Sequence, residues 1–393
     1  MAQVIIDIIT VISGAVSLVG FIEQNVPNKD NQGNSIVRVA AGISSQGLKG
    51  GGTAPVIWAY NEQYQMIGQY IDDSQTIQSG GFLDLNVNQN VGVNGAGKGQ
   101  QATYIQVVAS APICIPYISQ TWADGTNRGW LGDMATACGA THGMSTVIVG
   151  DSGHTPDCLW LAPQPNPQNV PAGVQIHMQD FASLNNNYDK DPKHYCTWPK
   201  MEYRPNVKTA EISTFWDMTG HEAEQFAFTT VTDGVLNALN LPPESITIPP
   251  DAKKKTGRKR RSNRPMKRGV VEVLEHEERL RGEEVEKAAA VAATASLDFE
   301  GQLIITDYKR HTISNRCFDP LFLGPDVASL VESKFCDMKT RTVYQFCTQG
   351  EESGEEECFD VEALVLKKKG KPLKRSTYTH VKRWEMETNG EGA

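Results

Sequence analysis

A serine, a histidine and an aspartate lie close together in the sequence and could carry hydrolytic chemistry. Ser152, His154 and Asp157 fall in the stretch after Gly150. A nucleophilic serine needs a base that folds onto it and an oxyanion hole, and this spacing predicts neither. The Gly-x-Ser-x-Gly motif fails because His154 stands at its closing glycine. The pattern favours a turn after a strand, and a hydrolase with an unfamiliar site is retained only as an alternative.

Two further motifs are incomplete. The segment from Gly92 to Gly99 nearly matches a phosphate-binding P-loop, but Gly99 occupies the Ser or Thr position that would hold magnesium. The segment also precedes an expected strand, so no helix N-terminus would face a phosphate. His221-Glu222 lacks the second histidine of a zinc protease. We therefore predict no catalytic residue, no metal site and no cofactor, and a non-enzymatic protein is favoured.

The strongest local signal is a basic stripe between Lys253 and Arg268, which holds ten Lys or Arg residues and no acidic one. Removing these charges from the net charge of −9 leaves about −19 for the rest of the chain. Three interpretations compete: cleavage by a kexin-like protease after Arg261 or after the pair Lys267-Arg268, a nuclear or nucleic-acid signal, and a solvated linker. No aromatic residue is interleaved for base stacking, which disfavours nucleic acid. We favour processing.

The eight cysteines divide evenly around the basic stripe. They are Cys114, Cys138, Cys158 and Cys196 before it, and Cys317, Cys336, Cys347 and Cys358 after it. Even parity on each side predicts two separate disulfide frameworks, with three pairings open in each half. No Cys-x-x-Cys pair occurs, which argues against zinc ribbons. Disulfides favour a secreted protein, with a cytoplasmic or nuclear location as the alternative.

Residues 1–25 form a hydrophobic leader or an amphipathic helix. No Lys or Arg precedes the apolar stretch, and Asp7 lies inside it, which argues against both a signal peptide and a membrane span. Asp7, Ser13, Gly14 and Ser17 lie on one side of a helix whose other side is apolar. Such a helix could be cleaved, dock in a core, or contact a membrane, and these interpretations remain open.

The elements that must position any site are mostly short strands. Val37–Val39, Val56–Tyr60, Leu83–Val87, Thr103–Val108 and Thr146–Val149 are rich in β-branched and aromatic residues and are bounded by Gly and Asn. They predict a β-sandwich-like domain over residues 35–241. Residues 161–203 are rich in Pro and Asn and are expected to be irregular.

The second half of the chain is predicted to hold a separate module. A Pro-flanked basic linker over 242–269 leads to an exposed Glu- and Ala-rich helix over 270–297. Residues 301–366 should form a small α+β module with its own cysteines. The polar tail over 367–393 is expected to be disordered.

One combination of segments lies within residues 109–160: Pro112–Ser119, Thr121–Gly125, Trp130–Asp133, Cys138-Gly139 and Asp157–Trp160. On these segments the region resembles a group of uncharacterised proteins of filamentous fungi. No activity is known for the group, so the resemblance implies only a β-rich domain with Cys114, Cys138 and Cys158 near the sheet. Trp122, Trp130 and Trp160 are expected in the core or on a sheet face, with a carbohydrate-binding platform as the alternative.

These observations favour a secreted, non-enzymatic interaction protein. Its partner would be another protein, a cell wall or a host surface, and the basic linker would make it a substrate for a kexin-like protease. A membrane-active protein that uses the N-terminal helix is the alternative from a different class.

Overall fold

The computed structural model describes residues on both sides of the basic stripe. The described residues are 25–30, 32–42, 52–72, 74–89, 97–150, 154–164, 170–181, 192–205, 207, 297, 299–309, 311–347, 357–373 and 378–385. All described residues belong to one unit of the chain, Met1–Ala210 with Lys287–Ala393. The predicted linker over 242–269 lies outside them. The predicted helices over 1–25 and 270–297 also lie outside, except for Asn25 and Leu297.

The first sheet has four antiparallel strands in the order β10-β9-β1-β6. They are β1 (Ser35–Ala40), β6 (Phe82–Val87), β9 (Tyr117–Thr121) and β10 (Asn127–Leu131). In β6, Leu85 and Val87 are buried while Asp84 and Asn86 are exposed. This confirms the predicted strand with one wet face, since successive side chains point to opposite faces.

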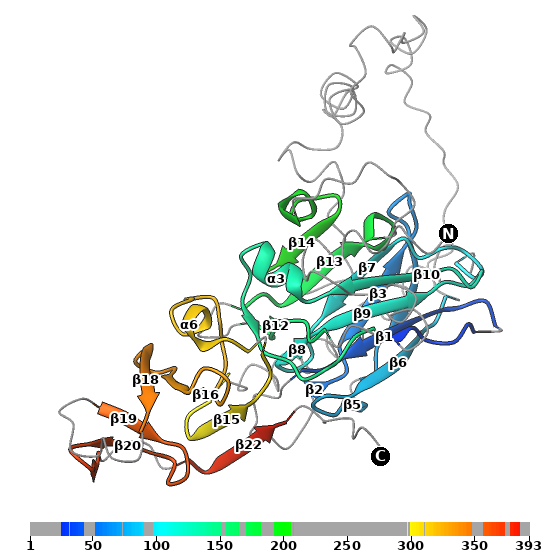
Figure 1. Ribbon diagram of the computed structural model, residues 1–393. Coiled ribbons are helices and arrows are strands. Elements are labelled where there is room, and N and C mark those ends of the chain that lie inside the picture. Colours follow the sequence, from blue (N-terminus) through cyan, green and yellow to red (C-terminus); the bar gives the residue numbers. More distant parts are fainter. Residues whose placement is uncertain are drawn as a thin grey trace, which may run out of the picture. The chain divides into compact units, whose positions relative to one another are not determined.

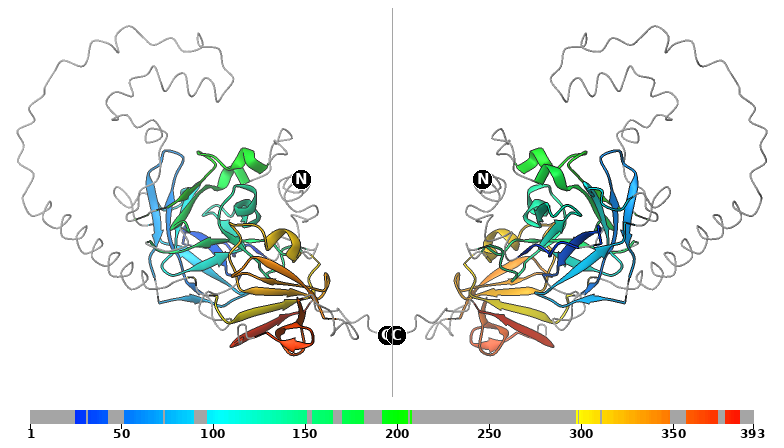
Figure 2. Two further views of the ribbon diagram at one scale, coloured as in Figure 1. Left: turned by 90° about the vertical axis from the view of Figure 1, so that its left-hand side faces the viewer. Right: turned by 90° about the vertical axis from the view of Figure 1, so that its right-hand side faces the viewer.

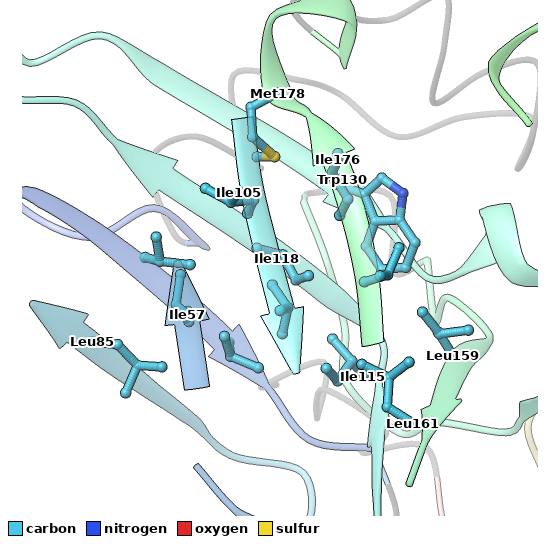
Figure 3. Close-up of a cluster of buried hydrophobic side chains, with 14 of the residues drawn as sticks. Ile57, Leu85, Ile105, Ile115, Ile118, Trp130, Leu159, Leu161, Ile176 and Met178 are labelled. Carbon is cyan, nitrogen blue, oxygen red and sulfur yellow. The ribbon is translucent and has the colours of Figure 1, made fainter. Parts of the chain in front are cut away.

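The second sheet has five antiparallel strands in the order β14-β13-β7-β3-β4. They are β3 (Val56–Tyr60), β4 (Met66–Tyr70), β7 (Tyr104–Val108), β13 (Gly173–His177) and β14 (Met201–Arg204). Apolar side chains of both sheets share one buried cluster, among them Leu85, Ile118 and Trp130 from the first and Ile57, Ile105 and Ile176 from the second (Figure 3). The segment is therefore β-sandwich-like, as predicted.

Smaller elements complete this segment. Strands β8 (Ile113–Ile115), β11 (His142–Gly143) and β12 (Cys158–Leu161) form a three-stranded sheet, and β2 (Gly52–Thr53) pairs with β5 (Thr76–Ile77). The described helical turns here are α3 (Asp133–Ala137), η2 (Met178–Phe181) and η3 (Pro192–Tyr195). Figure 1 shows α3 and the strands β13 and β14 close together at one end of this segment.

Two expectations for this segment were wrong. Residues 161–203 are not irregular throughout, because β13 and most of β14 lie there and extend the second sheet. The prolines before β13 fall outside the strand and leave its donors free to pair. Thr146–Val149 is not a strand, and Val149 makes only an isolated bridge with His154.

The carboxy-terminal segment is an eight-stranded sheet in the order β21-β20-β19-β18-β17-β16-β15-β22, coloured yellow to red in Figure 2. Its strands are β15 (Gln302–Thr306), β16 (Asp326–Ser329), β17 (Lys334–Asp337), β18 (Thr342–Phe346), β19 (Glu357–Asp360), β20 (Val365–Lys368), β21 (Lys371–Pro372) and β22 (His380–Trp384). The single described helix of the segment is the one-turn α6 (Ile313–Arg316), so the segment is mainly β rather than α+β.

The tail over 367–393 is not wholly disordered. Strand β22 lies in it and pairs in parallel with β15, from Gln302 opposite His380 to Thr306 opposite Trp384. Trp384 is buried against the same apolar cluster as Ile304. The charged composition of the tail concealed a strand that is anchored by one aromatic side chain.

All eight cysteines form disulfides, which confirms the expectation of one framework on each side of the basic stripe. The pairs are Cys114–Cys158, Cys138–Cys196, Cys317–Cys336 and Cys347–Cys358. Trp122, Trp130 and Trp160 are each at most 1% exposed. They are core residues and form no carbohydrate platform.

Candidate functional site

The candidate site is an aromatic patch made of Tyr64, Tyr104 and Trp198, with His177 beneath it. Tyr104 begins β7 and His177 ends β13, and the two residues are direct partners in the sheet. Their rings stack with centroids 4.2 Å apart and planes inclined by 20°. Because Ile105 and Ile176 point into the sandwich core, the pleat directs Tyr104 and His177 to the opposite face of the sheet.

Tyr64 is positioned by the turn between β3 and β4. The Asn61 side-chain oxygen accepts hydrogen bonds from the backbone N–H groups of Gln63 and Gln65, both at 3.0 Å. Asn commonly caps turns in this way. Tyr64 itself has a φ of 60°, a left-handed conformation that is unusual for a bulky residue. The turn thereby holds the Tyr64 ring 5.1 Å from that of Tyr104.

Trp198 closes the patch from the segment between η3 and β14. Its ring lies 5.6 Å from Tyr104 and 5.9 Å from Tyr64. Tyr104 is buried, whereas Tyr64 and Trp198 are both partly exposed. Offset aromatic contacts at these separations are favourable, so the two outer rings are held by the inner one while part of their surface faces solvent.

Two carboxylates flank His177. Its Nδ1 lies 2.8 Å from Asp180 Oδ2, and its Nε2 lies 3.1 Å from Glu62 Oε2. Burial alone would lower the pKa of His177, but the hydrogen bonds and charges of Asp180 and Glu62 outweigh it and raise that pKa to about 9. At neutral pH the group is an imidazolium between two carboxylates and carries a net charge of −1.

Glu62 presents the exposed end of this network. Its carboxylate accepts a hydrogen bond from the Thr103 hydroxyl at 2.7 Å. The hydrogen bond from His177 lowers the pKa of Glu62 despite partial burial. The Glu62 side chain is nevertheless 60% exposed. A fixed, ionised hydrogen-bond acceptor therefore lies beside the aromatic patch and faces solvent.

The pKa and the contacts of His177 do not suit a general base at neutral pH. A general acid or base works best with a pKa near the operating pH. His177 titrates well above neutrality, and both of its ring nitrogens are occupied by carboxylates. Within the described residues, no group of three or more His, Cys, Asp or Glu side chains is arranged to hold a metal ion. The arrangement offers apolar ring surface and a carboxylate, which are recognition groups.

Of the serine-type constellation, the structure describes His154 and Asp157 and pairs each of them with another residue. Ser152 lies outside the described residues. His154 Nε2 contacts Asp133 Oδ2 at 2.8 Å, and the Arg316 guanidinium donates to Asp157 Oδ1 at 2.6 Å. Burial raises the pKa of Asp133. At Asp157 burial also acts to raise the pKa, but the charges of Arg316 and His142 and the hydrogen bonds from Thr136 and Arg316 together outweigh it and lower the pKa. His154 and Asp157 are thus engaged by structural partners.

The other predicted site residues lie outside the residues that the structure describes. Arg261, Lys267 and Arg268 of the processing site lie there, as do Asp7, Ser13, Gly14 and Ser17 of the N-terminal helix. No helix in the described part of the chain is long and apolar enough to cross a membrane. These assignments stay predictions.

Sequence reasoning missed the aromatic patch. No motif in the sequence singles out His177, Glu62, Tyr64, Tyr104 or Trp198. Their proximity depends on the pairing of β7 with β13 and on the turn after β3. A local signal existed in the alternation of Val174, Gln175, Ile176 and His177, which predicts a strand with a polar face.

Comparison with known proteins gives no further guide to the site: no protein-family model, no curated protein and no solved structure matches the chain.

Proposed function

We propose that this chain is a secreted, non-enzymatic interaction protein that binds polysaccharide on a cell wall or host surface through its aromatic patch. The observation that carries the proposal is the pair of partly exposed rings, Tyr64 and Trp198, beside the exposed Glu62 carboxylate. The fungal resemblance of residues 109–160 and processing of the basic linker by a kexin-like protease belong to the same proposal.

The chemistry of the patch suits a sugar. A pyranose ring has an apolar face of C–H groups and a rim of hydroxyl donors. The rings of Tyr64 and Trp198 supply rigid apolar surface, and the Glu62 carboxylate accepts hydrogen bonds. The ion pair with His177 fixes that carboxylate, which reduces the entropy lost on binding. A rigid patch of this kind recognises a repeated surface without any catalytic group.

The extracellular assignment is supported by the four disulfides. Such bonds persist in oxidising compartments and are rare in the cytosol. Within the described residues every cysteine is paired, which is compatible with an extracellular protein.

A pull-down assay of the full chain with insoluble chitin, β-glucan and cellulose tests the proposal. We expect retention on at least one of them, and we expect Trp198→Ala and Tyr64→Ser to weaken it about tenfold, which corresponds to about 1.4 kcal/mol. The matched control is Phe82→Ala, because Phe82 is 52% exposed but lies in the other sheet, next to Arg38.

The proposal fails if all three polysaccharides leave the protein in solution. It also fails if Phe82→Ala reduces retention as much as Trp198→Ala does, because retention would then reflect general surface apolarity. Thermal melting of each variant checks that the fold is retained.

A further inference from the structure

The described residues before and after the basic stripe are in direct contact through their backbones. We call residues 25–207 the amino segment and residues 297–385 the carboxy segment. The His142 N–H donates to the Leu321 carbonyl at 3.0 Å, and the Leu323 N–H donates to the His142 carbonyl at 2.7 Å. A parallel bridge between His142 and Phe322 results. These hydrogen bonds join the backbone of strand β11 directly to that of residues 321–323.

Three side-chain contacts reinforce this joint. The Trp160 indole N–H donates to the Leu323 carbonyl at 2.9 Å, and His311 Nε2 lies 3.0 Å from the Ser145 carbonyl. The ion pair between Arg316 and Asp157 is only 18% and 14% exposed at its two side chains. Truncation of one partner of such a pair leaves a buried charge without compensation. The joint is therefore specific in geometry and in charge.

A single apolar cluster also spans the joint. The amino segment contributes Cys114, Met144, Cys158, Trp160, Ala162 and Val170. The carboxy segment contributes Leu297, Ile304, Ile313, Cys317, Phe322, Val327, Cys336 and Trp384. Separation of the segments would expose this cluster to water, at a free-energy cost of the kind that holds obligate interfaces together.

No disulfide crosses the joint. Cys114–Cys158 and Cys138–Cys196 lie within the amino segment, and the other two pairs lie within the carboxy segment. The only covalent connection between the segments is the chain that contains the basic stripe.

We propose that cleavage in the basic stripe converts this protein into a stable two-chain protein whose chains stay associated without a covalent link. The amino segment is then the binding partner of the carboxy segment. The apolar cluster, the Arg316–Asp157 ion pair and the bridge at His142 form the interface. The inference rests on the processing proposed above, but the association of the two chains is a separate physical property.

Two digestions separate these claims. The full wild-type chain is treated with a kexin-like protease, and a full-length variant that carries a site-specific protease sequence in place of residues 258–268 is treated with the matching protease. We expect each cut sample to elute from a native sizing column at the position of the uncut protein. The same samples should give two bands in a denaturing gel without reductant.

Separate elution of the two fragments from the cut variant would overturn the inference. If the kexin-like enzyme leaves the wild-type linker intact, the processing proposal is rejected, and the variant still tests the association. The two failures are thereby distinguished.

Two buried phenylalanines of the carboxy segment provide a matched comparison. Phe322 and Phe335 are each 1% exposed, but Phe322 belongs to the cluster at the joint and Phe335 to the segment's own cluster. In the cut protein, Phe322→Leu and Phe322→Ala should raise the dissociation constant of the two chains at least tenfold more than Phe335→Leu and Phe335→Ala do. Equal effects at the two positions would contradict the assignment of the interface. The leucine variants retain most of the volume and preserve the comparison if an alanine variant does not fold.

Discussion

Acidification should destabilise this protein through His311. The His311 ring is 2% exposed, with Nδ1 2.9 Å from the Thr306 hydroxyl and Nε2 3.0 Å from the Ser145 carbonyl. The carbonyl can only accept, so Nε2 carries the proton and Nδ1 accepts from the hydroxyl. A second ring proton, on Nδ1, would reverse this bond, so that the Thr306 hydroxyl oxygen would have to accept it. Burial and the nearby Arg316 charge lower the pKa of His311 from 6.5 to about 4.

The magnitude follows from linkage. The folded state favours neutral His311, so this contribution to stability is complete above about pH 6.5 and is lost as the pH falls toward about 4. A pKa difference of one corresponds to about 1.4 kcal/mol. The full displacement therefore corresponds to about 3 kcal/mol, which is a large part of the free energy of unfolding of an ordinary domain.

The assay is urea unfolding of the wild type and His311→Gln between about pH 4.5 and about pH 7.5. The glutamine amide can still donate to the Ser145 carbonyl but does not titrate. The other titrating groups are common to both proteins, so the difference between the two curves isolates His311. We expect the wild type to lose about 2 to 3 kcal/mol more than His311→Gln on acidification. Parallel curves would refute the reasoning.

Three other perturbations give measurable outcomes. Asp84→Asn should lower the free energy of unfolding by about 1 kcal/mol in urea titrations, because Arg38 would lose a two-pronged contact at 2.6 and 2.8 Å. Burial raises the pKa of Asp326 to about 6. The folded state therefore favours protonated Asp326, and the free energy of unfolding falls as the pH rises from about 4 to about 6. Asp326→Asn should remove up to about 3 kcal/mol of that pH dependence, as measured by urea unfolding at several pH values. Replacement of both Cys114 and Cys158 by alanine should cost about 4 kcal/mol by calorimetry, since their disulfide closes a loop with a sequence separation of 44.

Strands rich in β-branched or alternating apolar residues could be predicted from the sequence. Val37–Val39, Val56–Tyr60 and Leu83–Val87 combine β-branched or apolar residues with bounding turn residues, and each is found in a sheet. Strand β13 was missed because the prolines upstream dominated the composition of its neighbourhood. Strand β22 was missed because its centre holds two consecutive charged residues, Lys382 and Arg383, although Trp384 is buried. The average composition of a stretch of sequence therefore fails to reveal a short strand that only one or two buried residues hold in place.

The candidate site needed information that no local pattern holds. Tyr104 and His177 meet because β7 and β13 pair in one particular register, and a shift by one residue would turn one of them into the core. The place of Tyr64 in the aromatic patch depends on its left-handed φ, in a turn that the Asn61 side chain stabilises by hydrogen bonds. The even number of cysteines on each side of the basic stripe correctly predicted one disulfide framework per side. The sequence could not distinguish the three possible pairings on each side, and the sheet geometry selects one.

The disulfides and the joint are physically coupled, although no disulfide crosses it. Cys114–Cys158 and Cys317–Cys336 both lie in the apolar cluster that the two segments share. Each bond restrains its own segment in the shape that the partner segment packs against, so it reduces the entropy lost when the segments associate. Reduction of these two pairs should therefore weaken the association of the two segments, even though it leaves the polypeptide chain of each segment intact. The Cys347–Cys358 pair lies outside that cluster, so its replacement by alanines in the cut protein should leave the association of the two chains unchanged.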